Sequence, residues 1–381
     1  YSFGPHLHLD MIESATRDYV DPLPFFMEKV KDNIAPRAEG IILFPQPGKG
    51  VVNGKQIHRT FPVNPTQPIT AWGLIGAGIR AYDHMDGVGN RYGVHTVILE
   101  VDGEEVFRSV VDRFAYEENR YINSWTHGQY MKSFIEPGNR LRMLHASNGN
   151  RGLVEINEER PYRFVYTLSD ALGNTSKVRF TVQGKNTEIH PVEHREKYAF
   201  KWDRTNYLQE PGLELVVPRG MLYDDVWLDY SVRADSGDVA FTYQLHNKRV
   251  PLHGACEMRI GLRRDRLEDK SKYYVAGVTA RGGKYSIGGT YEDGFMKVRI
   301  RDLGTYTVAV DTVPPEIIPL NPGQWGRTGR ITLKAKDKET GINSYRGTID
   351  GKYALFGKPN SISGNLVCEL DPKHVKKGGR H

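Results

Sequence analysis

The sequence has little of what would make a helical, membrane-spanning or disulfide-bonded protein. Only two cysteines, Cys256 and Cys368, occur in 381 residues, which gives no disulfide framework and leaves the redox compartment open. No apolar run approaches the roughly 20 residues that a membrane-spanning helix needs, and the sequence leaves a lipid anchor upstream open. Apolar residues at helical spacing are also sparse, and we expect a short helix only over residues 25–31.

Concentrated charge is missing as well. The 52 Lys and Arg residues are scattered among 46 Asp and Glu residues, with a formal net charge of +6. A nucleic-acid-binding protein normally shows a basic stripe or a known module, and neither is visible, so we expect no nucleic-acid partner. The positive excess could help to contact anionic cell-wall polymers, but a mixed solvated surface is the preferred interpretation.

What the chain does contain favours β-structure. It has 40 Gly, 21 Pro and 21 Tyr, and short segments of alternating apolar and polar residues appear throughout. This pattern is typical of antiparallel strands joined by many turns. The length exceeds what one hydrophobic core usually serves, so two to four domains are expected.

An internal repeat gives the organisation. Each copy has a proline joint between strands, then a strand ending in aspartate, then an Asp-Gly hairpin turn, which is the strongest short hairpin signal. These features occupy residues 32–37, 79–83 and 101–103 in the first copy and residues 311–316, 333–337 and 349–351 in the second.

The first copy closes with residues 168–176 (LSDALGNTS) and an alternating strand, an ending common in bacterial immunoglobulin-like sandwiches. The second copy stops before such an ending, which suggests an excerpt of a longer chain. We predict an Ig-like β-sandwich over residues 32–190, a second β-sandwich over 191–312 and a partial third Ig-like domain over 313–381.

The amino end carries the most informative motif. Residues 4–10 read GPHLHLD, so His6 and His8 are separated by one residue. On a strand, side chains at this spacing point to the same face, and one imidazole could hold a metal while the other stands beside its water. A catalytic zinc usually has three protein ligands and one open position. The pair supplies two ligands at most, so the others must come from elsewhere.

This motif, followed by residues 21–26 (DPLPFF), resembles the carboxy-terminal end of the M23 (LytM-like) metallopeptidase domain, whose members cut peptide cross-links in bacterial peptidoglycan. The resemblance implies that His8 is a zinc ligand and that His6 is the catalytic residue that orients or deprotonates the zinc-bound water. The family's earlier His and Asp ligands have no counterpart upstream of His6. Residues 1–31 are therefore expected to be the remnant of a peptidase domain that is inactive by itself.

The rest of the chain looks like the long β-rich extension that follows M23 domains in some Gram-negative envelope proteins. The expected fold class is all-β, with tandem immunoglobulin-like β-sandwich domains after the peptidase remnant. The implied function is that of a portion of a zinc endopeptidase in the periplasm or cell envelope, with peptidoglycan or other envelope components as partners. The alternative is a non-catalytic envelope scaffold or binding subunit with a degenerate peptidase-like domain.

Two further motifs have simpler interpretations. Residues 73–78 (GLIGAG) superficially resemble a dinucleotide-binding loop, but a strand-like segment follows where a helix is needed, so we expect a bulge or a close backbone approach. Asp83, Asp86 and Asp102 could gather around Ca²⁺, although turn and hairpin positions explain them better. The tryptophans are dispersed and are expected to be core residues.

Overall fold

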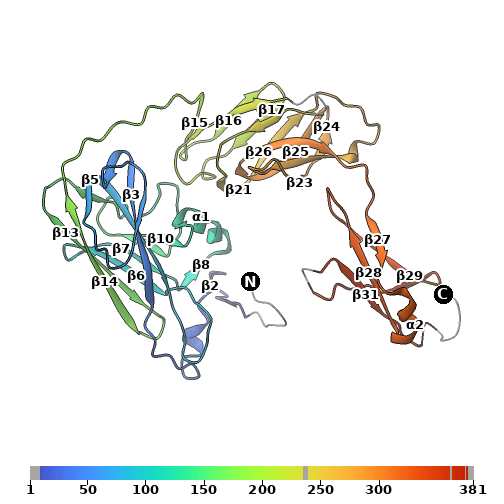
Figure 1. Ribbon diagram of the computed structural model, residues 1–381, viewed down its shortest axis with the longest axis horizontal. Helices are drawn as coiled ribbons and strands as arrows, with labels where there is room; N and C mark the ends of the chain where they lie inside the picture. Colours follow the sequence, from blue (N-terminus) through green and yellow to red (C-terminus); the bar gives the residue numbers. More distant parts are fainter. Residues whose placement is uncertain (1–8, 235–238, 361–362, 374, 376–381) are drawn as a thin grey trace. The chain divides into compact units, whose positions relative to one another are not determined.

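A computed structural model describes residues 9–234, 239–360, 363–373 and 375 (Figure 1). The chain forms two compact units, and each is described by itself. The first unit comprises Tyr1–Asn206, Pro218–Trp227 and Pro251–Gly254, and the second comprises Tyr207–Val217, Leu228–Val250 and Ala255–His381. Strands dominate both units, so the fold class is all-β, as expected. None of the helices in the described residues is long and apolar enough to cross a membrane.

Helices are few and short. The described α-helices are α1 (Ile122–Trp125) and α2 (Trp325–Thr328), and the 3-10 helices are η1 (Leu23–Phe25), η2 (Tyr116–Tyr121), η3 (Lys270–Lys272) and η4 (Pro322–Gln324). The helix expected over residues 25–31 is wrong, because only η1 and a following turn form there. Phe25, Phe26 and Met27 are exposed, so this segment buries no apolar face that could stabilise a short helix.

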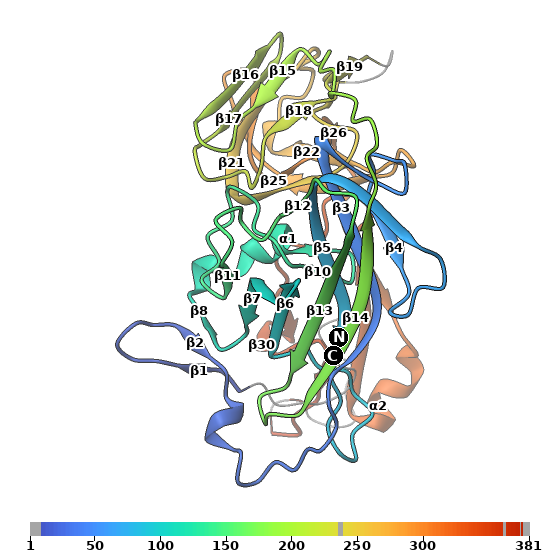
Figure 2. The same ribbon diagram turned by 90° about the vertical axis from the view of Figure 1, so that its left-hand side faces the viewer.

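The first unit is built on an 11-stranded sheet, which we call the N-terminal β-domain (residues 37–184). Figure 2 shows its long strands, with β13 and β14 paired antiparallel and β14 beside β5 in parallel. The strands are β3 (Arg37–Val52), β4 (Arg59–Phe61), β5 (Ile69–Tyr82), β6 (Thr96–Val101), β7 (Glu104–Val110), β9 (Thr126–His127), β10 (Tyr130–Lys132), β11 (Leu144–Ala146), β12 (Val154–Ile156), β13 (Pro161–Ser169) and β14 (Thr175–Gly184).

Alternation along these strands produces the core. Every second residue of β13 is buried, namely Tyr162, Phe164, Tyr166 and Leu168, which is the period that one face of a pleated strand requires. The hydroxyl of the fully buried Tyr166 lies 2.9 Å from Ser133 Oγ, so its polar end is satisfied.

A small three-stranded sheet joins the amino end to this domain. It contains β1 (Met11–Ile12), β2 (Tyr19–Val20) and β8 (Arg113–Phe114) in the order β1-β2-β8. Tyr19 is paired with Phe114 across β2 and β8, and their rings stack with centroids 5.5 Å apart. The segment after the His pair is thus hydrogen-bonded to a strand that lies about a hundred residues later in the chain.

Residues 198–310 form two five-stranded sheets and one two-stranded sheet. In sheet order, the five-stranded sheets consist of β16 (Asn206–Glu210), β17 (Leu213–Val217), β21 (Val250–Gly261), β25 (Phe295–Leu303) and β24 (Thr290–Glu292), and of β19 (Ser231–Arg233), β20 (Thr242–Gln244), β26 (Thr305–Val310), β22 (Tyr273–Val278) and β23 (Lys284–Gly288). The pair is β15 (Tyr198–Phe200) with β18 (Val226–Leu228). Both larger sheets contribute buried apolar residues, such as Leu215 from β17 and Val308 from β26.

The carboxy-terminal region has a three-stranded sheet and a hairpin. The sheet contains β27 (Glu316–Pro319), β28 (Arg330–Lys336) and β31 (Asn365–Glu369), and the hairpin contains β29 (Gly347–Ile349) and β30 (Lys352–Ala354). Among apolar residues of its described part, only Leu366 and Cys368 are buried. Cys256 and Cys368 are both free and buried.

The domain boundaries predicted after residues 31, 190 and 312 stay predictions.

The repeat is visible in the strand register. Arg37 pairs with Tyr82, the residue before Asp83, and Glu316 pairs with Lys336, the residue before Asp337. Both Asp-Gly turns have the positive φ angles of two-residue hairpins: 54° and 90° at residues 102 and 103, and 51° and 76° at residues 350 and 351. The two copies therefore share this strand pairing and the Asp-Gly hairpin turn.

Candidate functional site

His6 and His8, the catalytic and zinc-binding residues implied by the sequence, lie outside the described residues. The description begins at Leu9, immediately after the motif. Residues 9–21 attach to the N-terminal β-domain through β2 and through side-chain contacts.

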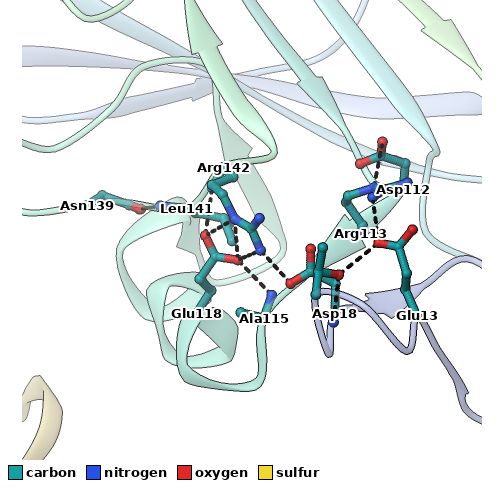
Figure 3. Close-up of polar contacts among 10 residues, drawn as sticks. Glu13, Asp18, Asp112, Arg113, Ala115, Glu118, Asn139, Leu141 and Arg142 are labelled. Atoms are coloured by element: carbon teal, nitrogen blue, oxygen red, sulfur yellow. Dashed lines mark hydrogen bonds and ion pairs between the residues drawn. The ribbon is translucent and has the colours of Figure 1, made fainter.

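Arg142 is the centre of that attachment (Figure 3). Its guanidinium donates two bonds of 2.9 Å to the separate carboxylate oxygens of Glu118, and Nη2 also donates to Asp18 Oδ1 at 2.8 Å. Glu118 accepts a further bond of 2.7 Å from the backbone N–H of Ala115. Asp18 comes from the amino-terminal segment and the other groups come from the β-domain, so one cation holds the two parts together.

The electrostatics of these groups follow from the same contacts. The hydrogen bond from Arg142 holds the pKa of Asp18 below its ordinary value. Burial acts to raise the pKa of Glu118, but the bonds from Arg142 and Ala115 outweigh it, and the pKa is lowered. Both carboxyls are therefore anionic at neutral pH, and they form charge-assisted bonds.

A second contact supports the attachment. Arg113 Nη1 donates to Glu13 Oε2 at 3.1 Å, and the Thr16 hydroxyl donates to the same oxygen at 2.7 Å. These side chains are largely exposed, so this bridge is worth at most about 1 kcal/mol. The buried Asp18 and its partner Arg142 are the stronger link.

A cleft of ≈ 580 Å³ lies beside the attached segment. Leu9, Val94, Trp125 and Met131 are among its apolar lining residues. Its polar lining includes six aspartates: Asp10, Asp21, Asp32, Asp83, Asp112 and Asp170. The cleft is thus apolar over much of its wall and acidic at particular points.

Three of these aspartates form a cluster, which we call the acidic triad: Asp32, Asp83 and Asp170. One carboxylate oxygen from each lies within 4.8 Å of the others. Asp32 precedes β3, Asp83 follows β5 and Asp170 follows β13. β3 pairs with β5, and β14 lies between β5 and β13, so one sheet brings together residues that are far apart in the sequence. In the described residues this is the only group of three or more His, Cys, Asp or Glu side chains with ligand atoms so close.

The triad is only partly satisfied by hydrogen bonds. Asp32 Oδ1 accepts from the N–H of Ile34 at 3.0 Å, and Asp170 Oδ1 accepts from the N–H groups of Leu172 and Asn174 at 2.9 and 2.8 Å. Asp32 Oδ2 and Asp83 Oδ1 are buried and have no hydrogen-bond partner. No Lys, Arg or His of the described residues forms an ion pair with the triad, and the charge of the neighbouring His84 acts to lower the pKa of Asp83 without outweighing its burial.

Ionisation is least favourable for Asp83, because its side chain is only 4% exposed. Burial raises its pKa to about 6, and the charges of Asp170 and Asp32 add to the rise, whereas a hydrogen bond with the backbone of His84 opposes it. A buried, unpaired carboxylate is unfavourable unless something compensates it.

The Ca²⁺ grouping weighed from the sequence differs from this cluster. Asp102 lies in the hairpin turn, where its carboxylate accepts from Arg160 Nη1 at 2.7 Å and from the N–H of Arg163 at 2.8 Å. Asp86 is exposed and accepts from Asn33 Nδ2 at 2.9 Å. The structure therefore agrees with the preferred interpretation of Asp102 as a hairpin residue, and it does not group Asp83 with Asp86 and Asp102. Asp83 lies beside Asp32 and Asp170 instead. From the sequence, Asp83 is a candidate Ca²⁺ ligand with other partners, whereas Asp32 and Asp170 stand out only as parts of the repeat motifs.

The glycines of residues 73–78 permit close packing, as expected. A Cβ at Gly73 would lie 2.2 Å from the carbonyl oxygen of Lys49, and one at Gly76 would lie 2.5 Å from the ring of Phe134. These residues belong to β5, so no nucleotide loop forms. Among the tryptophans, Trp125 is buried, and Trp227 stacks on His194 with centroids 3.6 Å apart.

Comparisons with known proteins cover part of the chain. A family described as a Zu5-like domain matches residues 197–311, the span of the two five-stranded sheets. No curated protein sequence matches the chain. A solved chain from work titled "Structural insight into host cell surface retention of a 1.5-MDa bacterial ice-binding adhesin" is 9% identical over 78% of this chain and 80% of that chain, with a TM-score of 0.13. A TM-score of this size carries no argument about fold or function.

Proposed function

We propose that this chain is mainly the non-catalytic, β-rich extension of an M23-type zinc endopeptidase that acts on peptidoglycan cross-links in a Gram-negative cell envelope. In this proposal residues 1–31 are the end of the peptidase domain, and immunoglobulin-like sandwiches follow. The observation that carries the proposal is the motif of residues 4–10 together with residues 21–26.

The attachment of residues 9–21 supports a mechanical role for the extension. Asp18 and β2 hold the end of the segment that follows the His pair against the N-terminal β-domain. In the complete enzyme His8 would hold zinc, and His6 would assist proton transfer from the bound water. Zinc supplies polarisation of the scissile carbonyl and lowers the pKa of that water.

Metal analysis and a cleavage assay test the proposal on this chain. Two imidazoles are too few ligands for tight zinc binding, so the purified chain should hold no stoichiometric zinc and should release no peptide from cross-linked peptidoglycan. A polypeptide that also supplies the family's earlier ligands should bind one zinc and cleave, and should lose both with His8→Ala. Tight zinc in this chain by itself, lost with His8→Ala, would contradict the assignment of the missing ligands.

A non-catalytic envelope scaffold is the second candidate. The acidic triad is the only candidate metal cluster among the described residues, and it contains no nitrogen ligand of the kind a catalytic zinc site uses. Loss of the earlier His and Asp ligands in the complete protein, with retained binding to peptidoglycan in a pull-down, would favour the scaffold over the peptidase.

A further inference from the structure

We propose that Asp32, Asp83 and Asp170 bind one Ca²⁺ ion, which fastens the proline joint before β3 to the two loops that follow β5 and β13. The site uses none of the residues of the His pair. Asp83 and Asp170 belong to the N-terminal β-domain, and Asp32 belongs to the segment that leads into it.

The ligand chemistry selects a hard cation. All three side chains offer carboxylate oxygens, and neither nitrogen nor sulfur is part of the cluster. Ca²⁺ takes oxygen ligands at about 2.3–2.6 Å, so two oxygens bound to the same ion lie at most about 5 Å apart. The triad oxygens already lie within 4.8 Å of one another, so a Ca²⁺ ion could bind all three with little rearrangement.

The hydrogen bonding leaves the right atoms available. Asp32 Oδ2 and Asp83 Oδ1 are buried without a partner, whereas Asp32 Oδ1 and Asp170 Oδ1 accept from backbone N–H groups that orient the carboxylates. Asp170 Oδ2 accepts one bond, so it keeps a second lone pair for a metal. Asn174 Nδ2 donates to the backbone oxygen of Asp32 at 3.0 Å and to Asp170 Oδ2 at 2.7 Å, which links two of the three loops independently of a metal. Backbone carbonyls and water would complete the coordination, as is usual for Ca²⁺.

The negative charge of the acidic triad also favours binding of a cation. Three carboxylates meet without an ion pair from the described residues, and Asp83 is almost fully buried. A divalent ion would offset most of this charge and would cross-link segments separated by more than fifty residues. Ion binding should therefore stabilise the folded N-terminal β-domain by mass action.

Calorimetric titration with Ca²⁺ and thermal unfolding in Ca²⁺ or EDTA test the site on the whole chain. We expect one Ca²⁺ per chain and a Tm of the first unit that rises with Ca²⁺ concentration. Asp83→Asn should weaken Ca²⁺ binding at least about tenfold, because it removes one of three charged ligands. The matched control Asp86→Asn, which changes an exposed carboxylate in the same loop, should bind Ca²⁺ like the unchanged chain.

Unfolding in EDTA distinguishes an effect of the substitution on folding from its effect on Ca²⁺ binding. Asp83→Asn should unfold in EDTA at the same temperature as the unchanged chain or a higher one, because it removes a buried charge. Absence of binding at millimolar Ca²⁺, or equal binding by Asp83→Asn, would overturn the proposal. An equal rise in Tm with Mg²⁺ at the same concentration would overturn the assignment to Ca²⁺.

Discussion

The two copies of the repeat differ in how they satisfy the carboxylate of the aspartate at the proline joint. In the first copy, Asp32 Oδ2 at the proline joint has no hydrogen-bond partner. In the second copy, the equivalent Asp311 Oδ2 accepts from the N–H of Thr340 at 3.2 Å and from its hydroxyl at 2.6 Å. In the aligned repeat Asp86 follows Asp83 as Thr340 follows Asp337, so an aspartate occupies the position of Thr340, and a carboxylate has no proton to donate.

The aspartates that end the second strand of each copy differ in the same sense. Asp337 Oδ1 accepts from the N–H groups of Glu339 and Gly341 at 3.0 and 2.8 Å, so its loop folds around its own carboxylate. Asp83 Oδ1 is buried and unpaired. The second copy satisfies itself with hydrogen bonds, whereas the first leaves oxygens for an additional ligand. One repeat can therefore be used as an internal control for the other.

The largest expected effect is the pH dependence of the first copy without metal. A pKa raised from 3.8 to about 6 means that ionisation of Asp83 destabilises the fold, by up to about 3 kcal/mol. This cost is absent below pH 3.8, grows as pH rises and is complete above pH 6. In EDTA, denaturant unfolding of the first unit should show this loss, and Asp83→Asn should remove it.

In the second copy, ionisation of the equivalent aspartate stabilises the fold instead of destabilising it. Hydrogen bonds from Thr340 lower the pKa of Asp311, so its contribution is present above pH 3.8 and is lost as pH falls through the lower folded value. Carboxyl ¹³C NMR should show Asp83 titrating well above Asp311. Equal titration midpoints would mean that the two joints are electrostatically alike, which contradicts the comparison.

The sequence predicted the repeat better than the site. Alternating residues and the Asp-Gly turns at residues 102–103 and 350–351 depend on neighbours in the chain, so local patterns were enough. The triad depends on strand pairing that joins residues 32, 83 and 170, and one sequence does not reveal which aspartates will meet. The helix expected over residues 25–31 failed because nothing packs against its apolar side chains.

Removal of the Thr340 hydroxyl should have a moderate effect, confined to the second copy. Thr340→Val keeps the side-chain shape but leaves the buried Asp311 Oδ2 with one longer bond, which should cost about 2 kcal/mol. Hydrogen exchange of the β28 amides should report this loss, and Thr340→Ser, which keeps the donor, should restore protection. Unchanged exchange in Thr340→Val would show that the second joint does not depend on this bond.

Substitution of the hairpin-turn glycine should have the smallest effect on stability, and the effect should be equal in the two copies. Gly103 and Gly351 have φ angles of 90° and 76°, and a Cβ at either would meet nothing within 4 Å. Alanine at each should therefore cost only backbone strain, about 1 kcal/mol. Hydrogen exchange in the β6–β7 and β29–β30 hairpins measures both variants. Equal losses would localise the difference between the copies to the aspartate joints, whereas a clearly larger loss in one hairpin would mean that the copies differ throughout.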